Sequence, residues 1–236
     1  MRLSAPVHQL KRRAKLLART ENIAMHKALD RIARAEGFAT WSLLSARALP
    51  ASATRLLPGL AHGDFVLLAA RPGHGKTLLG IRLLLDALDA GRRGVFYTLE
   101  YSSREVVERV RSLSGSSPGV VGAMEIVTSA DISAGYITHH LSDAQAGTVA
   151  VVDYLQILDQ RRDKPPLAEQ MDALRAFARR SGTILVFISQ IDRSFDPAAK
   201  PVPDMADIRL PNPIDMGMFS KACFLHDGRM QVHEIA

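Results

Sequence analysis

The chain has 236 residues, of which 47% are hydrophobic and 23% are charged, so it can bury the core of one α/β domain with a small appendage. No apolar run approaches the ~20 residues that a membrane-spanning helix needs, and the N-terminus lacks the apolar segment of a secretory signal. The single cysteine, Cys223, excludes an internal disulfide framework; its apolar neighbours predict a buried strand position, and a reducing cytoplasm is the expected location.

The net charge of +6 is concentrated towards the N-terminus. Residues 1–55 contain eleven Lys and Arg against three Asp and Glu, a balance of +8, whereas the rest of the chain carries 19 against 21, a balance of −2. A basic end on a nearly neutral body indicates a polyanion or an acidic protein surface as partner. A basic helix that is merely solvated is the alternative.

Residues 7–48 are predicted to form short helices. The stretches LKRRAKLLA and ALDRIARA have apolar residues at helical spacing. Gly37 is expected to end the second helix, and apolar residues around Trp41 predict a third helical turn. This rhythm is only weak evidence for a DNA-reading helix–turn–helix, so docking onto the rest of the chain or onto a partner protein stays open.

The stretch LPASATRLLPG, bounded by Pro50 and Pro58, is expected to be a linker. It separates a basic helical N-terminal segment, residues 1–50, from a larger domain, residues 51–236.

From residue 62 onward, apolar strands alternate with helices. The predicted strands are Phe65–Ala70, Val95–Leu99, Glu125–Thr128, Val149–Leu155 and Ile184–Ser189. The predicted helices are Thr77–Ala90, Arg104–Leu113, Ile132–Ala146 and Leu167–Arg180. Continuous apolar strands between helices predict an α/β fold with a mainly parallel sheet flanked by helices on both faces. A final hairpin is expected to turn at Asp227-Gly228.

The stretch FVLLAARPGHGKTLLG, residues 65–80, is typical of a phosphate-binding loop. Its strand runs into a glycine loop and then a helix, and it fits the form G-x-x-x-x-G-K-[ST] except that Ala70 takes the first position. Glycines and a helix N-terminus let backbone N–H groups converge on phosphates, Lys76 adds a charge, and the Thr77 hydroxyl can ligate Mg²⁺. His74 is expected to contribute its backbone while its side chain stays exposed. The predicted nucleotide-binding residues are Arg71, Pro72, Gly73, His74, Gly75, Lys76, Thr77 and Leu78.

Three further strand ends carry polar side chains suited to phosphate chemistry. Asp153 follows the apolar run TVAVV and is the candidate second metal ligand, with simple capping of the strand as the alternative. Glu100 is a candidate general base, although it is also placed to cap the helix that begins near Ser102. Gln190 is a candidate sensor of the phosphate, or an ordinary polar residue at a strand end. Nucleic-acid contacts are expected in or near the loop that follows, from Arg193, Lys200 and Arg209.

The strings AARPGHGKT, FYTLEYS, VVDYLQIL and ISQIDRS, in this order, resemble the RecA-like ATPase domain of the bacterial replicative DNA helicases of the DnaB type. The resemblance covers roughly residues 52–236. It implies ATP and Mg²⁺ as cofactors, with Lys76 and Thr77 at the phosphates and Mg²⁺, and Asp153 on the metal side. It further implies Glu100 as catalytic base and Gln190 as γ-phosphate sensor. A hexameric ring with nucleotide sites between subunits and single-stranded DNA in a basic central channel is expected with it.

The sequence departs from this family at both ends. A short basic segment takes the place of the family's N-terminal helical domain, and no residue matches the Lys-x-Arg pair that reaches the neighbouring subunit's γ-phosphate. Slow hydrolysis is therefore expected unless Arg229 or Lys221 substitutes. A nucleotide-dependent switch or adaptor that assembles through its N-terminal helices, or a recombination mediator on the same fold, remains the alternative to a DNA helicase.

Overall fold

A computed structural model describes residues 3–50, 52–53, 56–114, 122–159, 164–209 and 214–235. Within these ranges, none of the helices combines the length and the apolar character needed to cross a lipid bilayer.

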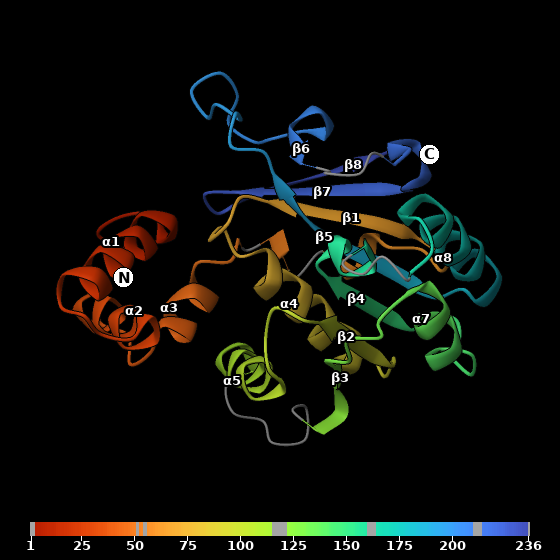
Figure 1. The fold of residues 1–236 in the computed structure, drawn as a ribbon, viewed down its shortest axis with the longest axis horizontal. Coiled ribbons are helices and arrows are strands. Elements are labelled where there is room, and N and C mark those ends of the chain that lie inside the picture. The colour runs from red at the N-terminus through yellow and green to blue at the C-terminus, as the bar shows by residue number, and fades with distance from the viewer. Residues whose placement is uncertain are drawn as a thin grey trace.

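An eight-stranded sheet forms the centre of the described structure, in the order β3-β2-β4-β5-β1-β7-β8, with β6 pairing to β5 (Figure 1). β6 and β8 run antiparallel to their neighbours and the other pairs are parallel, so the predicted mainly parallel sheet is confirmed. The strands are β1 Phe65–Ala70, β2 Gly94–Thr98, β3 Glu125–Val127, β4 Val149–Asp153, β5 Ile184–Ile191, β6 Ile208–Arg209, β7 Lys221–His226 and β8 Arg229–Glu234. β7 and β8 form the expected hairpin around Asp227-Gly228, and Cys223 is buried in β7.

Helices cover both faces of this sheet. The α-helices are α1 Val7–Thr20, α2 Met25–Ala35, α3 Trp41–Arg47, α4 Lys76–Asp89, α5 Ser103–Ser114, α7 Ala134–His140 and α8 Leu167–Ser181. Short 3₁₀ helices lie at Leu57–Gly59, Leu155–Asp159, Met205–Asp207 and Met216–Met218. The predicted helix 132–146 is shorter than expected, because the chain leaves helical geometry after His140 and turns before β4.

The apolar runs of the strands are continuous because each strand is buried on both sides. Along β1, Phe65, Leu67 and Ala69 join one core cluster with residues of α7 and α8. The alternate residues Val66 and Leu68 join a second cluster with residues of α4 and α5. Side chains of successive strand residues point to opposite faces, so both faces of β1 need apolar cover.

The parallel register gathers the strand ends that matter for function. Ala70, the last residue of β1, lies opposite Gln190 of β5. Thr98, the last residue of β2, lies opposite Asp153 of β4. Because parallel strands bring their carboxyl ends to one edge, the glycine loop and the candidate acids meet there.

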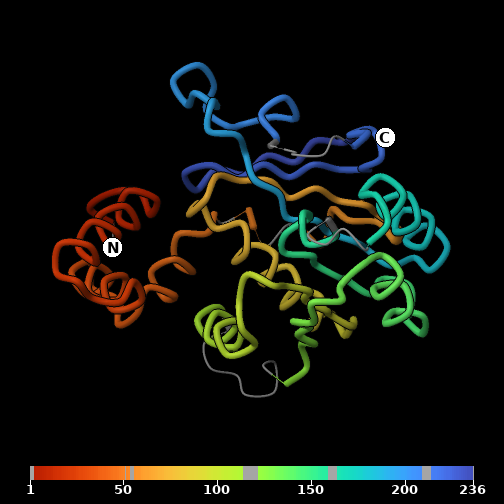
Figure 2. The backbone as a smooth tube through the Cα atoms, viewed as in Figure 1, coloured from red at the N-terminus to blue at the C-terminus, as the bar shows by residue number. Residues whose placement is uncertain are grey.

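The N-terminal helices α1, α2 and α3 form a small cluster of their own beside this edge, near α4 and α5 (Figures 1 and 2). Leu10, Ala33 and Leu44, one from each helix, pack together in its core and are fully buried, as are Ala14 and Ala28. The Asp30 carboxylate accepts a hydrogen bond of 2.9 Å from the backbone N–H of Trp41, which fixes the start of α3 on α2. We call residues 3–50 the N-terminal helical segment.

The packing of α4 on the sheet gives a test of the fold. A Cβ atom at Gly80 would lie 3.0 Å from Val151 Cγ1 and 3.1 Å from Ile188 Cδ1, so α4 approaches β4 and β5 closely there. Gly80→Val should lower the free energy of unfolding by about 2 kcal/mol through overpacking and the melting temperature by about 4–8 °C. Gly135→Val in α7, where a Cβ meets nothing within 4 Å, is the control and should leave stability nearly unchanged. Equal melting temperatures for the two variants would contradict this packing.

Candidate functional site

The glycine loop has the backbone that a phosphate site needs. β1 ends at Ala70 and α4 begins at Lys76, so the predicted strand, loop and helix are confirmed. Gly73 and Gly75 have φ angles of +91° and +90°, a left-handed conformation that residues with a side chain rarely adopt. Lys76 and Thr77 are each only 7% exposed, at the first turn of the helix. The N-terminus of α4 therefore presents a positive dipole end and a lysine at one place.

Thr77 and Asp153 are joined directly. Thr77 Oγ1 donates a hydrogen bond of 2.8 Å to Asp153 Oδ2, while Asp153 Oδ1 is buried without a hydrogen-bond partner in the described structure. Burial is the main cause that raises the pKa of Asp153, to about 6, and Lys76 opposes that rise. A side chain that only capped β4 would not contact the first turn of α4, so the geometry favours a role for Asp153 at the loop.

Glu100 faces the same lysine. Its Oε2 atom lies 3.9 Å from Lys76 Nζ. The N-terminus of α5 is capped without it: Glu105 accepts a 2.9 Å hydrogen bond from the backbone N–H of Ser102, and Ser102 Oγ accepts from the N–H of Glu105. The alternative that Glu100 caps this helix is therefore wrong, and its carboxylate is left for the site.

Gln190 and Arg71 connect the glycine loop to the segment that follows β5. Gln190 lines the same cavity as Lys76 and pairs through its backbone with Arg209 of β6. The sequence places Arg71 at the nucleotide, but its guanidinium donates hydrogen bonds of 2.6 Å to Arg193 O and 2.8 Å to Phe195 O. A change at the phosphate loop would therefore reach residues 191–209 by two routes.

The predicted nucleic-acid residues differ in how available their charges are. Arg193 is exposed, whereas Lys200 Nζ lies 2.6 Å from Asp204 Oδ2 and 2.7 Å from Asp207 Oδ2. The side chain of Arg209 lies outside the described part of the structure. Two carboxylates already match the charge of Lys200, so Arg193 is the more available cation of the two.

Lys221 is not placed to substitute for the Lys-x-Arg pair that reaches a neighbouring subunit's γ-phosphate. It pairs with Val66 near the start of β1, at the sheet edge opposite the glycine loop. Its Nζ lies 3.2 Å from Asp64 and 2.9 Å from Glu234, so two carboxylates hold it. Arg229 begins β8, immediately after the Asp227-Gly228 turn, and stays near the site.

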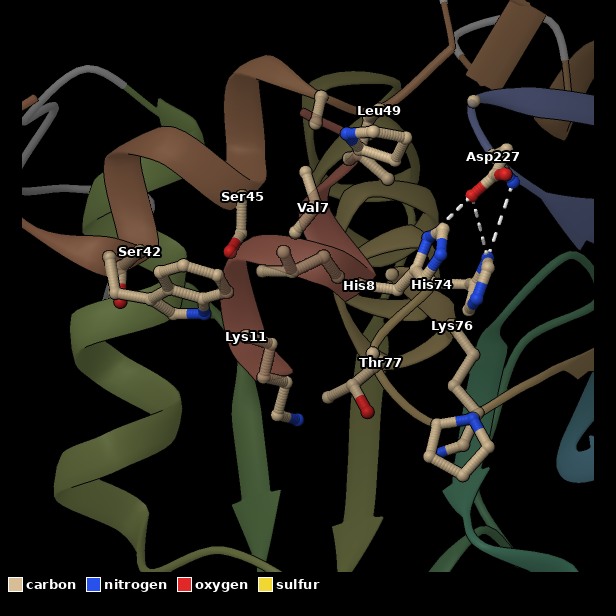
Figure 3. A pocket seen from close by; sticks show the side chains of 18 of the residues that line it. Val7, His8, Lys11, Ser42, Ser45, Leu49, His74, Lys76, Thr77 and Asp227 are labelled. Carbon is tan, nitrogen blue, oxygen red and sulfur yellow. Dashed lines mark hydrogen bonds and ion pairs between the residues drawn. The ribbon is translucent and has the colours of Figure 1, made fainter. Parts of the chain in front are cut away.

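The expectation that the His74 side chain is exposed is wrong. Its imidazole is 5% exposed and stacks between His8 and His226, with ring centroids 4.7 Å apart in both pairs. Burial, followed by the charge of His226, lowers the pKa of His74 to about 4. Asp227 closes the cluster, since its carboxylate lies 2.8 Å from His8 Nδ1 and its backbone N–H donates to His74 Nδ1 at 3.2 Å (Figure 3). We call these four residues the histidine cluster; atoms of His8, His74 and Asp227 lie within 4.8 Å of one another, a spacing compatible with metal ligation.

A cavity of about 670 Å³ opens over the glycine loop. Residues 72–78, Glu100, Arg109 and Gln190 line it from the sheet side, and residues of the N-terminal helical segment line it from the other side. Figure 3 shows the side chains of Lys11, Lys76 and Thr77 projecting towards one space. The sequence analysis missed Lys11 and Arg109; the three-residue spacing of His8 and Lys11, which puts both on one helix face, was the available signal.

Comparison with known proteins agrees with this geometry. The family model of the DnaB-like helicase C-terminal domain matches residues 52–119. A probable plasmid replicative DNA helicase of Chlamydia muridarum (strain MoPn / Nigg) is 30% identical over 180 residues, which cover 64% of this chain and 40% of that protein. The chain thus spans well under half the length of this relative.

Solved structures show the same fold. A DnaB-like replicative helicase, whose structure was determined with its interactions with primase, superposes with a TM-score of 0.60 at 17% identity over 92% of this chain and 65% of that one. A KaiC-like protein from the hyperthermophilic archaeon Pyrococcus horikoshii superposes with a TM-score of 0.56 at 17% identity, covering 80% of this chain and 86% of that one. The chain therefore has a RecA-like fold, and its residues 52–119 are similar to the DnaB-like helicase C-terminal domain.

Proposed function

We propose that this domain binds and hydrolyses Mg-ATP and couples hydrolysis to single-stranded DNA, as a helicase domain. The observation that carries the proposal is the meeting of two pairs, Thr77 with Asp153 and Lys76 with Glu100, at the glycine loop of one cavity. Each pair joins a group suited to phosphate or metal binding to a carboxylate from a neighbouring strand.

The triphosphate is bound by the glycine loop and the start of α4. Backbone N–H groups at a helix N-terminus favour an anion, and the positive φ of Gly73 and Gly75 lets the loop approach it closely. Lys76 supplies the charge that binds the β- and γ-phosphates. Lys76 Nζ lies 3.9 Å from Glu100 Oε2, a distance longer than a hydrogen bond, and its charge also acts on the buried Asp153 carboxylate.

Mg²⁺ fits beside Thr77 and Asp153. A hard cation prefers hydroxyl and carboxylate oxygens, and Asp153 offers a buried Oδ1 that has no hydrogen-bond partner among the described residues. Bound there, the ion would neutralise charge on the phosphate oxygens. Its two proposed protein ligands are already held by their mutual hydrogen bond, so little reorganisation is needed.

Glu100 is the proposed base that orients the attacking water. It lies in the cavity, is 37% exposed and therefore reachable by water, and is not used to cap α5. Gln190, at the end of the strand beside β1, is the proposed γ-phosphate sensor. Through Gln190 and the contacts of Arg71 with residues 193 and 195, the phosphate state would reach the segment proposed to contact DNA.

The partners proposed with this activity are single-stranded DNA, further copies of the chain in a ring, and a protein that docks on the N-terminal helical segment. The family match and the similarity to a helicase studied with primase support them.

A slowly hydrolysing switch or adaptor is the second candidate. It is favoured by one observation: the N-terminal helical segment lines the cavity opposite the glycine loop. A nucleotide bound in the cavity would contact this segment and could change its position. A recombination mediator on the same fold would differ in which loop meets DNA.

Lys76→Ala and Glu100→Gln separate binding from turnover. Lys76→Ala removes the phosphate cation and should abolish nucleotide binding in calorimetry. Glu100→Gln keeps the shape but loses the base, so ATP binding should persist while turnover falls by about 10²–10⁴-fold. Full turnover by Lys76→Ala would overturn the assignment of the site.

Asp153→Asn tests the buried carboxylate through stability in the metal-free protein. The fold raises the pKa of Asp153 from 3.8 to about 6. The stability that protonated Asp153 contributes to the folded state is therefore fully present below about pH 4 and is lost as the pH rises through about 6. In EDTA at pH 7.5 the variant should therefore melt several degrees above the wild type, by up to about 3 kcal/mol in unfolding free energy. The gap should close towards pH 4. A less stable variant at pH 7.5 would mean that the protein itself already compensates the charge.

Single-stranded DNA distinguishes the two candidate functions. A helicase domain should hydrolyse ATP at least about tenfold faster with DNA, because product release and chemistry are coupled to DNA movement. Arg193→Ala should reduce this stimulation without changing the basal rate, since Arg193 is exposed outside the cavity. A rate indifferent to DNA would favour the switch.

A further inference from the structure

The N-terminal helical segment forms one wall of the cavity over the glycine loop. The lining residues include Val7, His8 and Lys11 on α1, Trp41, Ser42 and Ser45 on α3, and residues that flank these two helices. In Figure 3, His8 is drawn beside His74, Lys11 projects into the same space as Thr77, and Ser42 and Ser45 lie farther from the loop.

Specific contacts hold this wall in place. His8 stacks on His74, a residue of the glycine loop itself, and its Nδ1 lies 2.8 Å from the Asp227 carboxylate. At the other end of the segment, Leu49 Cδ2 would be 3.4 Å from a Cβ atom at Gly75. Contacts at both ends of the segment therefore fix it against two glycine-loop residues.

Lys11 is the charged group that this wall brings to the loop. Its Cδ lies 3.3 Å from the position of a Cβ at Gly73, so the lysine stem runs along the loop backbone. The side chain stays accessible through the cavity, but the surrounding protein and then the charge of Lys76 lower its pKa, with Arg109 adding to the effect. Among the described residues Lys11 forms no ion pair, and the charge of Glu100, which raises the pKa of Lys11, opposes only part of this lowering.

The charges around the cavity are unbalanced. Lys11, Lys76 and Arg109 line it from three different elements, and the acidic residues that line it are Glu100, which faces Lys76, and Asp227, which is paired with His8. Placing a cation beside another cation is unfavourable unless an anion joins them. A triphosphate carries several negative charges and would offset all three.

We propose that the N-terminal helical segment completes the nucleotide site within the same chain, with Lys11 binding the phosphates and the Trp41, Ser42 and Ser45 wall contacting the rest of the nucleotide. This inference rests on the proposed binding of ATP at the glycine loop. Indole rings and hydroxyl groups suit a nucleoside, since one stacks on a base and the others form hydrogen bonds. Nucleotide binding then stabilises the docked position of α1, α2 and α3.

Trp41 supplies the experiment, because it is the only tryptophan of the chain. Titrating the full chain with Mg-ATP should change its intrinsic fluorescence in a saturable way, with the same Kd as calorimetry measures. Lys11→Met keeps the apolar stem but removes the charge, and should raise that Kd at least tenfold. Lys15→Met, one turn further along α1 and outside the cavity lining, is the matched control and should bind as the wild type does.

The outcomes separate this inference from the proposed function. Heat on titration with no change in Trp41 fluorescence, or with Lys11→Met binding as tightly as Lys15→Met, would overturn the inference and leave ATP binding intact. No heat for the wild type would overturn both. Melting temperatures show whether each variant folds. Lys11→Arg keeps the charge and should bind Mg-ATP with a Kd within a few-fold of the wild type. Failure of this rescue would argue against a phosphate contact.

Discussion

The hydrogen bond between Thr77 and Asp153 is the interaction on which the site depends. It joins the first turn of α4 to the end of β4, across β5, and it exists because the parallel register brings these ends to one edge of the sheet. A fully buried carboxylate is costly, and its second oxygen finds no hydrogen-bond partner among the described residues. A fold that keeps such a group would gain from the cation proposed to bind there with the nucleotide.

The charges that line the cavity favour an anion. The glycine loop brings Lys76 to the positive end of α4, and the N-terminal helical segment adds Lys11 above it. Both lysines are repelled by each other and are only partly offset by Glu100. Burial, and then repulsion from Lys76, lower the pKa of Lys11. Phosphates bound between the two ammonium groups would attract both, so affinity would be gained without any new contact within the protein.

The sequence predicted the parts of the fold that local pattern controls. The apolar runs at residues 65–70, 149–153 and 184–189 form strands whose two faces are both buried. The glycine loop is recognisable because its positive φ angles at Gly73 and Gly75 are readily adopted only by glycine. The buried position of His74 was not predictable in this way, because its neighbours His8 and His226 come from opposite ends of the chain. Lys11 was missed for a related reason: a lysine on a basic helix looks solvated until the docking of that helix is known.

That docking bears on how the chain would assemble. In the family that the domain resembles, nucleotide sites are expected between subunits, so a neighbouring copy must approach the γ-phosphate. In this structure α1 and α3 of the same chain line the cavity opposite the glycine loop. The N-terminal helical segment and a neighbouring subunit would then compete for the cavity over the glycine loop. Otherwise the neighbouring subunit would have to reach the cavity from outside the wall that contains Lys11 and Trp41. The segment has its own apolar core, which includes Leu10, Ala33 and Leu44, and it contacts the loop through the histidine cluster and through Leu49. The balance between those contacts and the nucleotide therefore determines whether the site is closed by its own chain or open to a second one.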